Sequence, residues 1–233
     1  MPSSAPDTGF VFAATGAGFT ALATAAAQSL RAVSPAHPID LFTDQPCDDP
    51  VFDQVHQVDR QWHRPKFEAL RRSRFSKTIC LDADIIAVAD ISDIFQVLDR
   101  FDIAAAHERR RNTKGAMRPL TRPLPNAFPQ INSGLIGVRR SDQIIQLLDN
   151  VERTMVEGEF NRDQFVIREL LFDSDLRLAI LPPEYNLMAV RQIEAQGSKF
   201  TAPRILHLPR LHDHFRKNSK RLTDPSAIIG PDS

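Results

Sequence analysis

Two aspartates one residue apart, Asp82 and Asp84, follow the apolar run of residues 78–81. In an extended segment such a pair points to one side, with Cα atoms roughly 7 Å apart. Carboxylates this close repel each other unless a cation or base lies between them. Hard oxygen ligands favour Mg²⁺ or Mn²⁺, ions that are commonly shared with a diphosphate. Because the chain has 21 aspartates and a second such pair, Asp173 and Asp175, a solvated strand end is the alternative interpretation.

A glycine-rich turn suggests a competing chemistry. Gly16 and Gly18 lie between an apolar run and an alanine-rich stretch, in the G-x-G-x-x-A pattern and context of a dinucleotide-binding motif. Asp44, at the end of the next apolar run, is placed to serve a ribose. The chain's one tyrosine, Tyr185, lacks the lysine four residues later that a short-chain dehydrogenase needs. A nicotinamide-dependent oxidoreductase and a purely structural turn are the two alternatives for this segment.

The elements that must position these side chains form an α/β pattern. Short apolar runs predict buried strands, and longer periodic segments predict helices. Strands are expected at 10–14, 39–43, 51–58, 78–81, 103–106 and 131–138, the last interrupted at 132–134. Helices are expected at 20–33, 65–73, 91–98, 141–155 and from about 162. This alternation predicts an α/β fold with a mostly parallel central sheet flanked by helices. Since ligands bind beyond the carboxyl ends of such strands, residues 15–19 and 82–84 are expected along one rim.

Composition narrows the class of partner. The 29 basic and 29 acidic residues balance, so no overall charge attracts the chain to nucleic acid. The two cysteines form neither a metal-binding spacing nor the disulfide framework of a secreted protein, so a reduced cytosolic compartment is the default expectation. Residues 10–30 are too rich in alanine, threonine and glycine for a transmembrane segment, and no basic region precedes them as in a signal peptide. The predicted location is cytoplasmic, with peripheral attachment at the inner membrane as an option.

The surroundings of the aspartate pair resemble the core of GT-A glycosyltransferases. The match is strongest to family 8, the glycogenin and bacterial galactosyltransferase group, in which a lysine-bearing helix leads into a strand ending in Asp-x-Asp. Here that helix carries Lys66. The resemblance covers most of residues 9–210. Further stretches that match in the family's order are Thr15 and Phe19, the Asn132-Ser133-Gly134 strand, the Asp163-Gln164 helix start, residues 181–186 and the strand ending at His207.

The resemblance implies a GT-A fold in a single catalytic domain spanning 1–233. Residues 9–106 would form a nucleotide- and metal-binding half, and 131–210 a half for the donor sugar and acceptor. A basic, flexible, proline-rich loop at 107–130 would join them, and 211–233 would be a C-terminal tail. The implied activity is metal-dependent transfer of a sugar from a nucleoside-diphosphate sugar, a UDP-sugar, to an acceptor hydroxyl, with retention of configuration.

The resemblance also implies roles for individual residues. Asp82, Asp84 and His207 would bind Mn²⁺ or Mg²⁺, with Asp84 nearer the open end of the site. The donor would be bound by Asp82 and by Thr15, Phe19, Lys66, Asn132, Ser133 and Gly134, and Lys66 would add a positive charge at the departing diphosphate. Gln164 would lie near the reacting sugar carbon, and Asp163 would hydrogen-bond the sugar.

The chain departs from the family after residue 207, where a glycine and a tryptophan are missing. His212 or His214 is therefore an alternative third metal ligand, and Arg210, Lys217 or Lys220 an alternative to the family's phosphate-binding lysine. This departure leaves open a sugar-nucleotide-binding protein without turnover. The acceptor is expected at the 107–130 loop and is not specified by sequence: a saccharide, a lipid-linked molecule or a protein.

Overall fold

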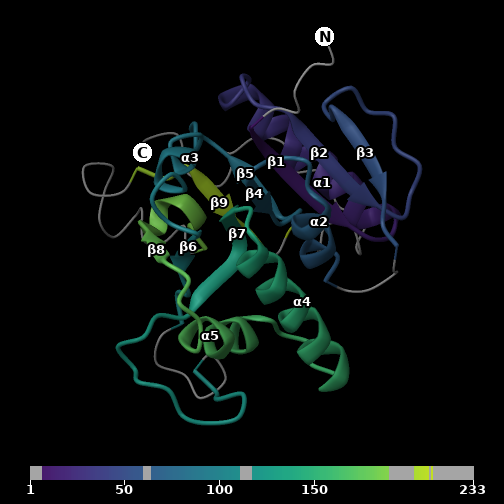
Figure 1. The fold of residues 1–233 in the computed structure, drawn as a ribbon. Helices are drawn as coiled ribbons and strands as arrows, with labels where there is room; N and C mark the ends of the chain where they lie inside the picture. The colour runs from purple at the N-terminus through teal and green to yellow at the C-terminus, as the bar shows by residue number, and fades with distance from the viewer. Residues whose placement is uncertain (1–6, 60–63, 111–116, 189–201, 210, 212–233) are drawn as a thin grey trace.

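The computed structural model describes residues 7–59, 64–110, 117–188, 202–209 and 211. Its centre is a seven-stranded sheet in the order β3-β2-β1-β4-β7-β6-β8 (Figure 1). These strands are β1 (Thr8–Ala14), β2 (Ile39–Thr43), β3 (Gln54–Gln57), β4 (Lys77–Leu81), β6 (Ile103–His107), β7 (Ile131–Arg139) and β8 (Leu178–Leu181). The pairs among β3, β2, β1 and β4, and the pair β6–β8, are parallel, whereas β7 is antiparallel to both its neighbours. The predicted mostly parallel sheet is confirmed.

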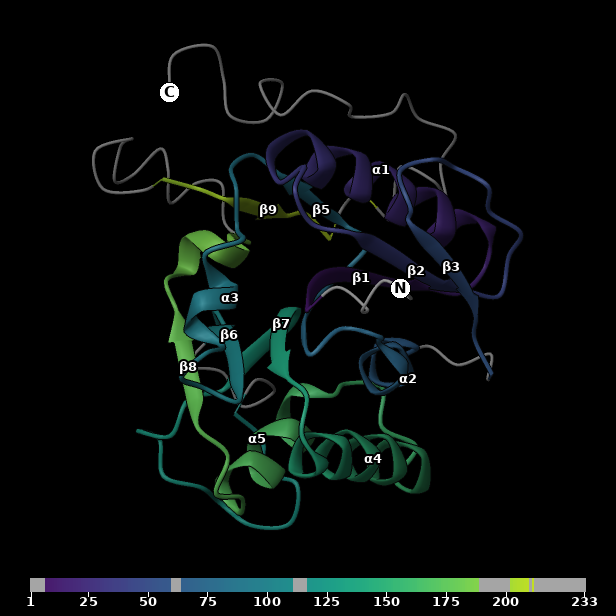
Figure 2. The same cartoon turned by 45° about the horizontal axis from the view of Figure 1, so that its top comes forward.

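Helices cover both faces of the sheet. They are α1 (Ala17–Val33), α2 (Lys66–Arg72), α3 (Ile94–Val97), α4 (Asp142–Glu157), α5 (Gln164–Phe172) and the 3₁₀ turn η1 (Pro183–Asn186). In Figure 2, α1 lies on one side of the sheet and α2, α4 and α5 lie on the other. A small second sheet, β5 (Ile85–Ala87) with β9 (Ile205–His207), lies on the α1 side.

Strand alternation explains why one sheet serves two hydrophobic cores. On β4, Ile79 and Leu81 pack with α1 residues in one core, and Cys80 between them packs with α2, α4 and α5 residues in the other. Successive side chains of a strand point to opposite faces, so a strand covered on both sides is apolar throughout. This explains why the predicted strands were continuous apolar runs.

Several sequence-based boundaries need correction. β7 runs unbroken through residues 132–134, because their backbone continues in the sheet although their side chains are polar or absent. The helix expected over 91–98 is only the four-residue α3, and the strand expected over 51–58 is the shorter β3. Strands β5 and β8 were not predicted from the residue pattern. Both are short, and in β8 only Leu181 is buried, whereas Ile180 is exposed.

The described part of the 107–130 loop is held against α5 by two buried charged side chains. The Glu169 carboxylate accepts hydrogen bonds from the backbone N–H groups of Leu120 and Thr121. The Arg168 guanidinium donates to the carbonyls of Pro125 and Phe128 at 2.8 and 2.9 Å. Charged groups satisfied in this way fix the path of the chain next to α5.

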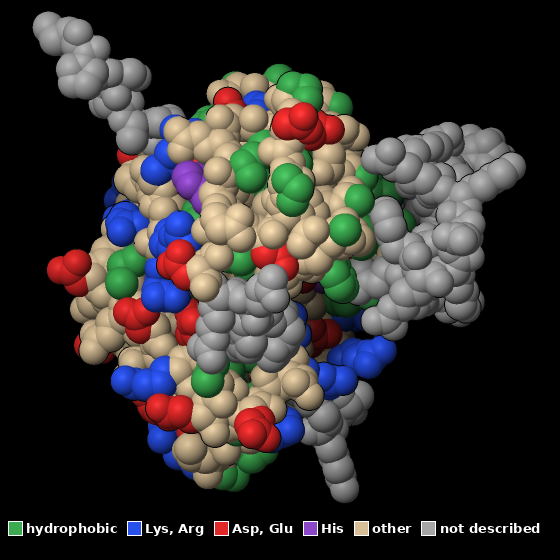
Figure 3. All heavy atoms as spheres, turned by 90° about the vertical axis from the view of Figure 1, so that its right-hand side faces the viewer, with side chains coloured by type: hydrophobic (Ala, Val, Ile, Leu, Met, Phe, Trp, Pro, Cys, Tyr) green, Lys and Arg blue, Asp and Glu red, His purple; other side chains and the backbone are tan. Residues whose placement is uncertain are grey.

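The surface shows no region of one charge sign on the face seen in Figure 3, where basic and acidic side chains are interspersed. This agrees with the balanced composition. Among the residues whose positions are given, no helix combines the length and apolar character needed to cross a membrane.

Candidate active site

The carboxyl ends of β1 and β4 meet at one cleft, as the parallel fold predicts. Phe12 is paired with Leu81, so the residues that follow each of them lie together. The cleft has a volume of about 380 Å³. It is lined by Ala13, Ala14, Thr15, Phe19, Arg64, Pro65, Lys66, Asp82, Ala83 and Asp84. The prediction that residues 15–19 and 82–84 share a rim is therefore confirmed.

Three side chains in this region can hold a metal ion together. Asp82, Asp84 and His207 each offer a ligand atom, and these atoms all lie within 4.8 Å of one another. The His207 Nε2 atom is 3.3 Å from Asp84 Oδ1 and 3.9 Å from Asp82 Oδ2. Carboxylate and imidazole donors suit Mn²⁺ and also accept Mg²⁺. The resemblance had placed Asp84 nearer the open end, but the Asp84 side chain is 6% exposed and that of Asp82 is 25% exposed.

The pairing of β5 with β9 brings His207 to the aspartates. Ile85 and His207 are direct partners, and the Leu208 N–H donates to the Asp84 carbonyl at 2.8 Å. Strand β5, directly after Asp84, thus pairs with β9, which lies far away in the sequence. Sequence patterns do not reveal this contact, because each strand has only three residues.

A chain of amide side chains fixes the orientation of the His207 ring. The Asn132 Oδ1 atom accepts from the Gly134 N–H and from Asn186 Nδ2, so the Asn186 Oδ1 atom faces the other way. That oxygen lies 2.8 Å from His207 Nδ1, which must carry the hydrogen. The Nε2 lone pair of the neutral ring then points toward the aspartates, as a metal ligand requires.

Gly134 has a steric role in this arrangement. A Cβ atom at this position would lie 2.3 Å from Cε1 and 2.4 Å from Nδ1 of His207. Such distances are far below van der Waals contact, so only glycine lets the ring pack against β7. The structure thus gives Gly134 a local function in addition to its predicted place at the donor.

The electrostatics around His207 favour a cation. Burial alone would lower the pKa of His207, but the hydrogen bond and charge of Asp84 and the charge of Asp82 outweigh this effect and raise it. Protons and metal ions compete for the same Nε2 atom, since a ligating imidazole must be neutral. A divalent ion would relieve the carboxylate repulsion more fully than one proton does.

Lys66 and Asp163 form a buried ionic group beside the three candidate metal ligands. Lys66 Nζ donates to Asp82 Oδ1 at 2.5 Å and to the Ser133 carbonyl at 2.8 Å. Burial lowers the pKa of Lys66, but the charges of Asp82 and Asp163 outweigh it and raise the pKa overall. Burial likewise raises the pKa of Asp163, and Lys66 and Arg64 reverse this and lower it. Both groups are therefore charged at neutral pH.

Glu108 is a site residue that the sequence did not reveal. Its Oε2 atom accepts hydrogen bonds from Asn132 Nδ2 at 2.8 Å and from Gln164 Nε2 at 2.5 Å. The carboxylate is buried and brings together two of the predicted site residues. Glu108 directly follows β6 at the carboxyl edge of the sheet, and this position could have indicated a site residue. It was missed because an acidic residue in the basic 107–130 loop is expected to be exposed to solvent.

The glycine turn is held by a hydrogen bond to Asp44. Gly16 has φ 84°, in the left-handed region that favours glycine. Its N–H donates to Asp44 Oδ1 at 2.7 Å. The amide that a dinucleotide's pyrophosphate would approach is thus already bonded to the carboxylate once assigned to the ribose. Thr15 and the 43% exposed Phe19 flank this turn on the cleft.

The alternative ligands His212 and His214, and the alternative phosphate-binding residues Arg210, Lys217 and Lys220, lie outside the residues that the structure describes.

Comparison with known proteins gives a structural match without a sequence match. No family model and no curated protein sequence matches the chain. Among solved structures, the glycosyltransferase GlyE of Streptococcus pneumoniae TIGR4 superposes with a TM-score of 0.60 at 19% identity. That alignment covers 95% of this chain but 63% of GlyE, so the chain spans less than two thirds of that protein.

Two further structures match over most of their length. An active-site mutant of LgtC has a TM-score of 0.60 at 14% identity, with 86% of each chain covered. Mouse xyloside xylosyltransferase 1 has a TM-score of 0.53 at 15% identity, covering 87% of this chain and 98% of that one. The sheet, its flanking helices and these neighbours agree: the chain has the GT-A fold of glycosyltransferases.

Proposed function

We propose that the chain is a metal-dependent glycosyltransferase that moves a sugar from a nucleoside-diphosphate sugar, a UDP-sugar, to an acceptor hydroxyl. The observation that carries this proposal is the convergence of Asp82, Asp84 and His207 at a cleft also lined by Thr15 and Phe19. A divalent ion shared by carboxylates and a diphosphate is a common arrangement for nucleotide substrates. One of the structural neighbours, LgtC, is a galactosyltransferase crystallised with donor and acceptor sugar analogues.

The residues have distinct tasks in this proposal. Asp82, Asp84 and His207 bind Mn²⁺ or Mg²⁺, which when bound acts as a Lewis acid toward the diphosphate oxygens. Thr15 and Phe19 flank the base. These residues belong to the proposed nucleotide- and metal-binding half, residues 9–106.

The proposed donor-sugar half, residues 131–210, contributes buried polar groups. Asp163 Oδ2 is buried and has no hydrogen-bond partner within the described residues, as expected for an acceptor that awaits a ligand hydroxyl. Asn132 and Ser133 of β7 are buried polar residues as well. Gln164 Nε2 is bonded to Glu108, so its Oε1 atom points away from that carboxylate.

In the reaction, the bond between the anomeric carbon and the diphosphate oxygen breaks, and a bond to the acceptor oxygen forms. For the proposed retention, the acceptor attacks from the side that the diphosphate leaves, and its proton passes to the departing diphosphate. The Gln164 Oε1 dipole stabilises positive charge at the anomeric carbon. A neutral amide is a weak nucleophile, so stabilisation is preferred to a covalent intermediate.

Thermal unfolding with UDP, with and without Mn²⁺, tests this proposal on the wild type and on Asp84→Ala. UDP is expected to raise the wild-type midpoint only when Mn²⁺ is present, and to leave that of Asp84→Ala unchanged. NAD⁺ and NADP⁺ serve as controls for the oxidoreductase alternative. Stabilisation by either dinucleotide, or by UDP without regard to metal and Asp84, would contradict the proposal.

A sugar-nucleotide-binding protein without turnover is the second candidate, suggested by the altered sequence after residue 207. An assay for slow hydrolysis of UDP-sugars distinguishes the glycosyltransferase from the binding protein. Release of UDP from any sugar in a panel, abolished by EDTA, supports the enzyme. Metal-dependent binding with no release from any donor supports the binding protein.

A further inference from the structure

Arg64 is a partly buried arginine that lines the cleft. It precedes α2 and lines the cleft together with Lys66, Asp82 and Asp84. One of its terminal nitrogens, Nη2, donates to the Asn161 carbonyl at 2.9 Å. Its Nε atom is buried, and no hydrogen-bond acceptor for it is found among the described residues. A buried donor without an acceptor requires an explanation, and a ligand in the cleft supplies one.

Lys66, the residue first expected at the diphosphate, is already engaged. Its Nζ atom donates to Asp82 and to the Ser133 carbonyl, and the residue is 6% exposed. An ammonium has three N–H donors, so only one remains. To contact a phosphate more fully, Lys66 would have to leave a metal ligand that it now holds.

The charges of the site leave a need for another cation. Asp82 and Asp84 together carry two negative charges, which a divalent ion balances. Lys66 and Asp163 balance each other and lie close enough to interact electrostatically with Arg64. A diphosphate adds further negative charge, and Arg64 is the additional permanent cation that lines the cleft in the described structure.

We infer that Arg64 binds the diphosphate of the donor and stabilises the charge that it gains as it leaves; this rests on the proposed function. The guanidinium presents several N–H donors in one plane, a geometry that matches phosphate oxygens. Arg64 thus does what was assigned to Lys66, and Lys66 acts on the protein side by fixing Asp82.

Titration calorimetry with UDP, UMP and uridine in the presence of Mn²⁺ tests the inference. Arg64→Ala is expected to weaken UDP binding about 10- to 100-fold, the usual effect of losing a charge-assisted hydrogen bond. Uridine has no phosphate, so its affinity is expected to stay within about twofold of the wild type. Arg64→Lys keeps the positive charge but lacks the planar set of donors, so its affinity for UDP is expected to lie between those of the wild type and Arg64→Ala.

Arg153→Ala is a matched control, because Arg153 is an exposed arginine on α4 whose Nη2 donates to Asn150 Oδ1 at 2.8 Å. It is expected to bind all three compounds as the wild type does. If Arg64→Ala weakens the binding of UDP and of uridine equally, Arg64 has a structural role and the inference is overturned. Unchanged UDP affinity in Arg64→Ala would also overturn it. If the wild type itself binds no UDP with Mn²⁺, the proposed function fails and this inference fails with it.

Discussion

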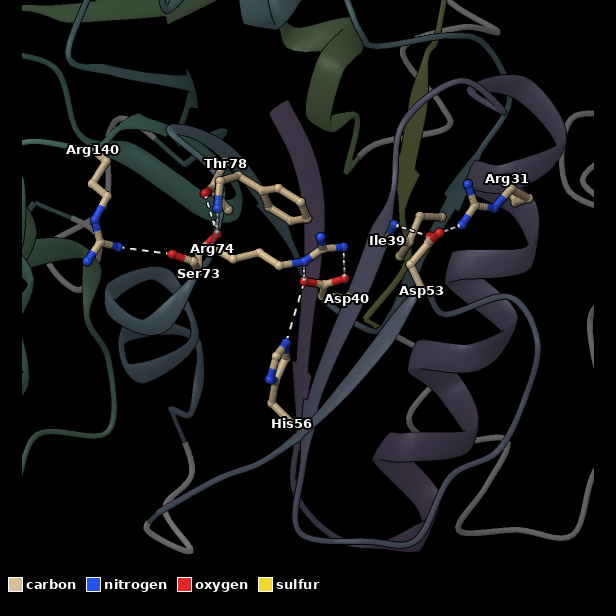
Figure 4. A network of polar contacts seen from close by, with 10 residues as sticks. Arg31, Ile39, Asp40, Asp53, His56, Ser73, Arg74, Thr78 and Arg140 are labelled. Carbon is tan, nitrogen blue, oxygen red and sulfur yellow. Dashed lines mark hydrogen bonds and ion pairs between the residues drawn. The ribbon is translucent and has the colours of Figure 1, made fainter. Parts of the chain in front are cut away.

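Two clusters of charged residues contain the same residue types, but one is structural and the other is the candidate metal site. Figure 4 shows the first, in which Asp40 of β2 meets Arg74 and His56. Arg74 Nε donates to Asp40 Oδ2 at 2.8 Å and Nη2 to Oδ1 at 3.0 Å, and His56 Nε2 lies 3.5 Å from Oδ2. Both carboxylate oxygens have cationic or ring N–H partners. This is a structural cluster, hereafter the Asp40 cluster.

The second cluster, formed by Asp82, Asp84 and His207 with Lys66, hereafter the Asp82 cluster, is incompletely balanced. Two carboxylates face one imidazole whose Nε2 is 3.3 Å and 3.9 Å from their oxygens. Like charges held together without enough positive charge make the empty arrangement less stable than it would be with a cation. The Asp40 carboxylate is matched by protein cations, whereas the Asp82 cluster has two carboxylates for one lysine when His207 is neutral, so it can gain stability from a bound cation.

The largest effect is expected when the Asp82 cluster loses a carboxylate, which should affect turnover far more than stability. Asp84→Asn is expected to lower turnover of a UDP-sugar by about 1000-fold or more, because metal binding loses one of its charged ligands. In EDTA its free energy of unfolding is expected to stay within about 1 kcal/mol of the wild type, since carboxylate repulsion is also removed. Hydrolysis assays and urea unfolding measure the two quantities. Turnover retained, or a large loss of stability, would assign Asp84 to a structural role.

The opposite result is expected in the Asp40 cluster. Arg74→Ala leaves the Asp40 carboxylate, whose side chain is 1% exposed, without its bidentate partner. Removal of one member of a buried ion pair typically costs about 3 kcal/mol. Urea unfolding is expected to show this loss, and the affinity of the folded protein for UDP with Mn²⁺ is expected to be unchanged. A variant as stable as Arg153→Ala would show that the Asp40 cluster is dispensable for folding.

A pair of glycine substitutions on β7 sharpens the account of the Asp82 cluster. Gly134→Ala forces the His207 ring to move, because the new Cβ would lie 2.3 Å from its Cε1 atom. Displacing a ligand or its support typically reduces metal affinity about 10- to 100-fold. Gly137→Ala on the same strand is the control, since its Cβ would lie 3.2 and 3.3 Å from side-chain methyl groups of Leu98 and Ile94 and 3.5 Å from the Ala104 carbonyl oxygen, far less crowded than at Gly134. Equal Mn²⁺ affinity in the two variants would contradict the placement of His207.

The smallest effect is expected at a third carboxylate, Asp102, and depends on pH. Burial raises the pKa of Asp102, but hydrogen bonds from Arg177 and Arg139 outweigh this and lower it from 3.8 to about 2. Because the folded-state pKa is depressed, this group contributes stability that is fully present above pH 3.8 and is lost as the pH falls toward 2. Asp102→Asn is expected to flatten the stability profile in that window by about 1–2 kcal/mol. An unchanged profile would show that Asp102 is not held by these arginines.

Much of the fold followed from sequence because its strands are apolar on both faces and its helices are periodic. The run of residues 10–14 and the capped segment beginning at Ser141 are examples, and the Ser141 hydroxyl does accept from the Ile144 N–H. The β5–β9 pair could not be predicted by pattern, because each strand has three residues and the two are far apart in the chain. The family resemblance, not periodicity, indicated the strand ending at His207.

The clustering of three candidate site residues could be predicted from sequence, but the hydrogen-bond network around them could not. The aspartate pair and the expected histidine come together as predicted. Glu108 was not expected, because its burial depends on β7 and α5 residues that meet it only in the folded chain. The specific roles of Gly134 and Asn186 also depend on the position of the His207 ring, which no local sequence pattern encodes.

Anomalous diffraction from crystals soaked with Mn²⁺ and UDP would locate the metal and the nucleotide together. One strong manganese peak is expected, bonded to Asp82, Asp84 and His207 and to oxygens of the UDP diphosphate. The nucleotide is expected in the cleft between Thr15 and Lys66. Manganese bound elsewhere, or UDP bound in this cleft with no manganese beside the two aspartates, would contradict the proposed function.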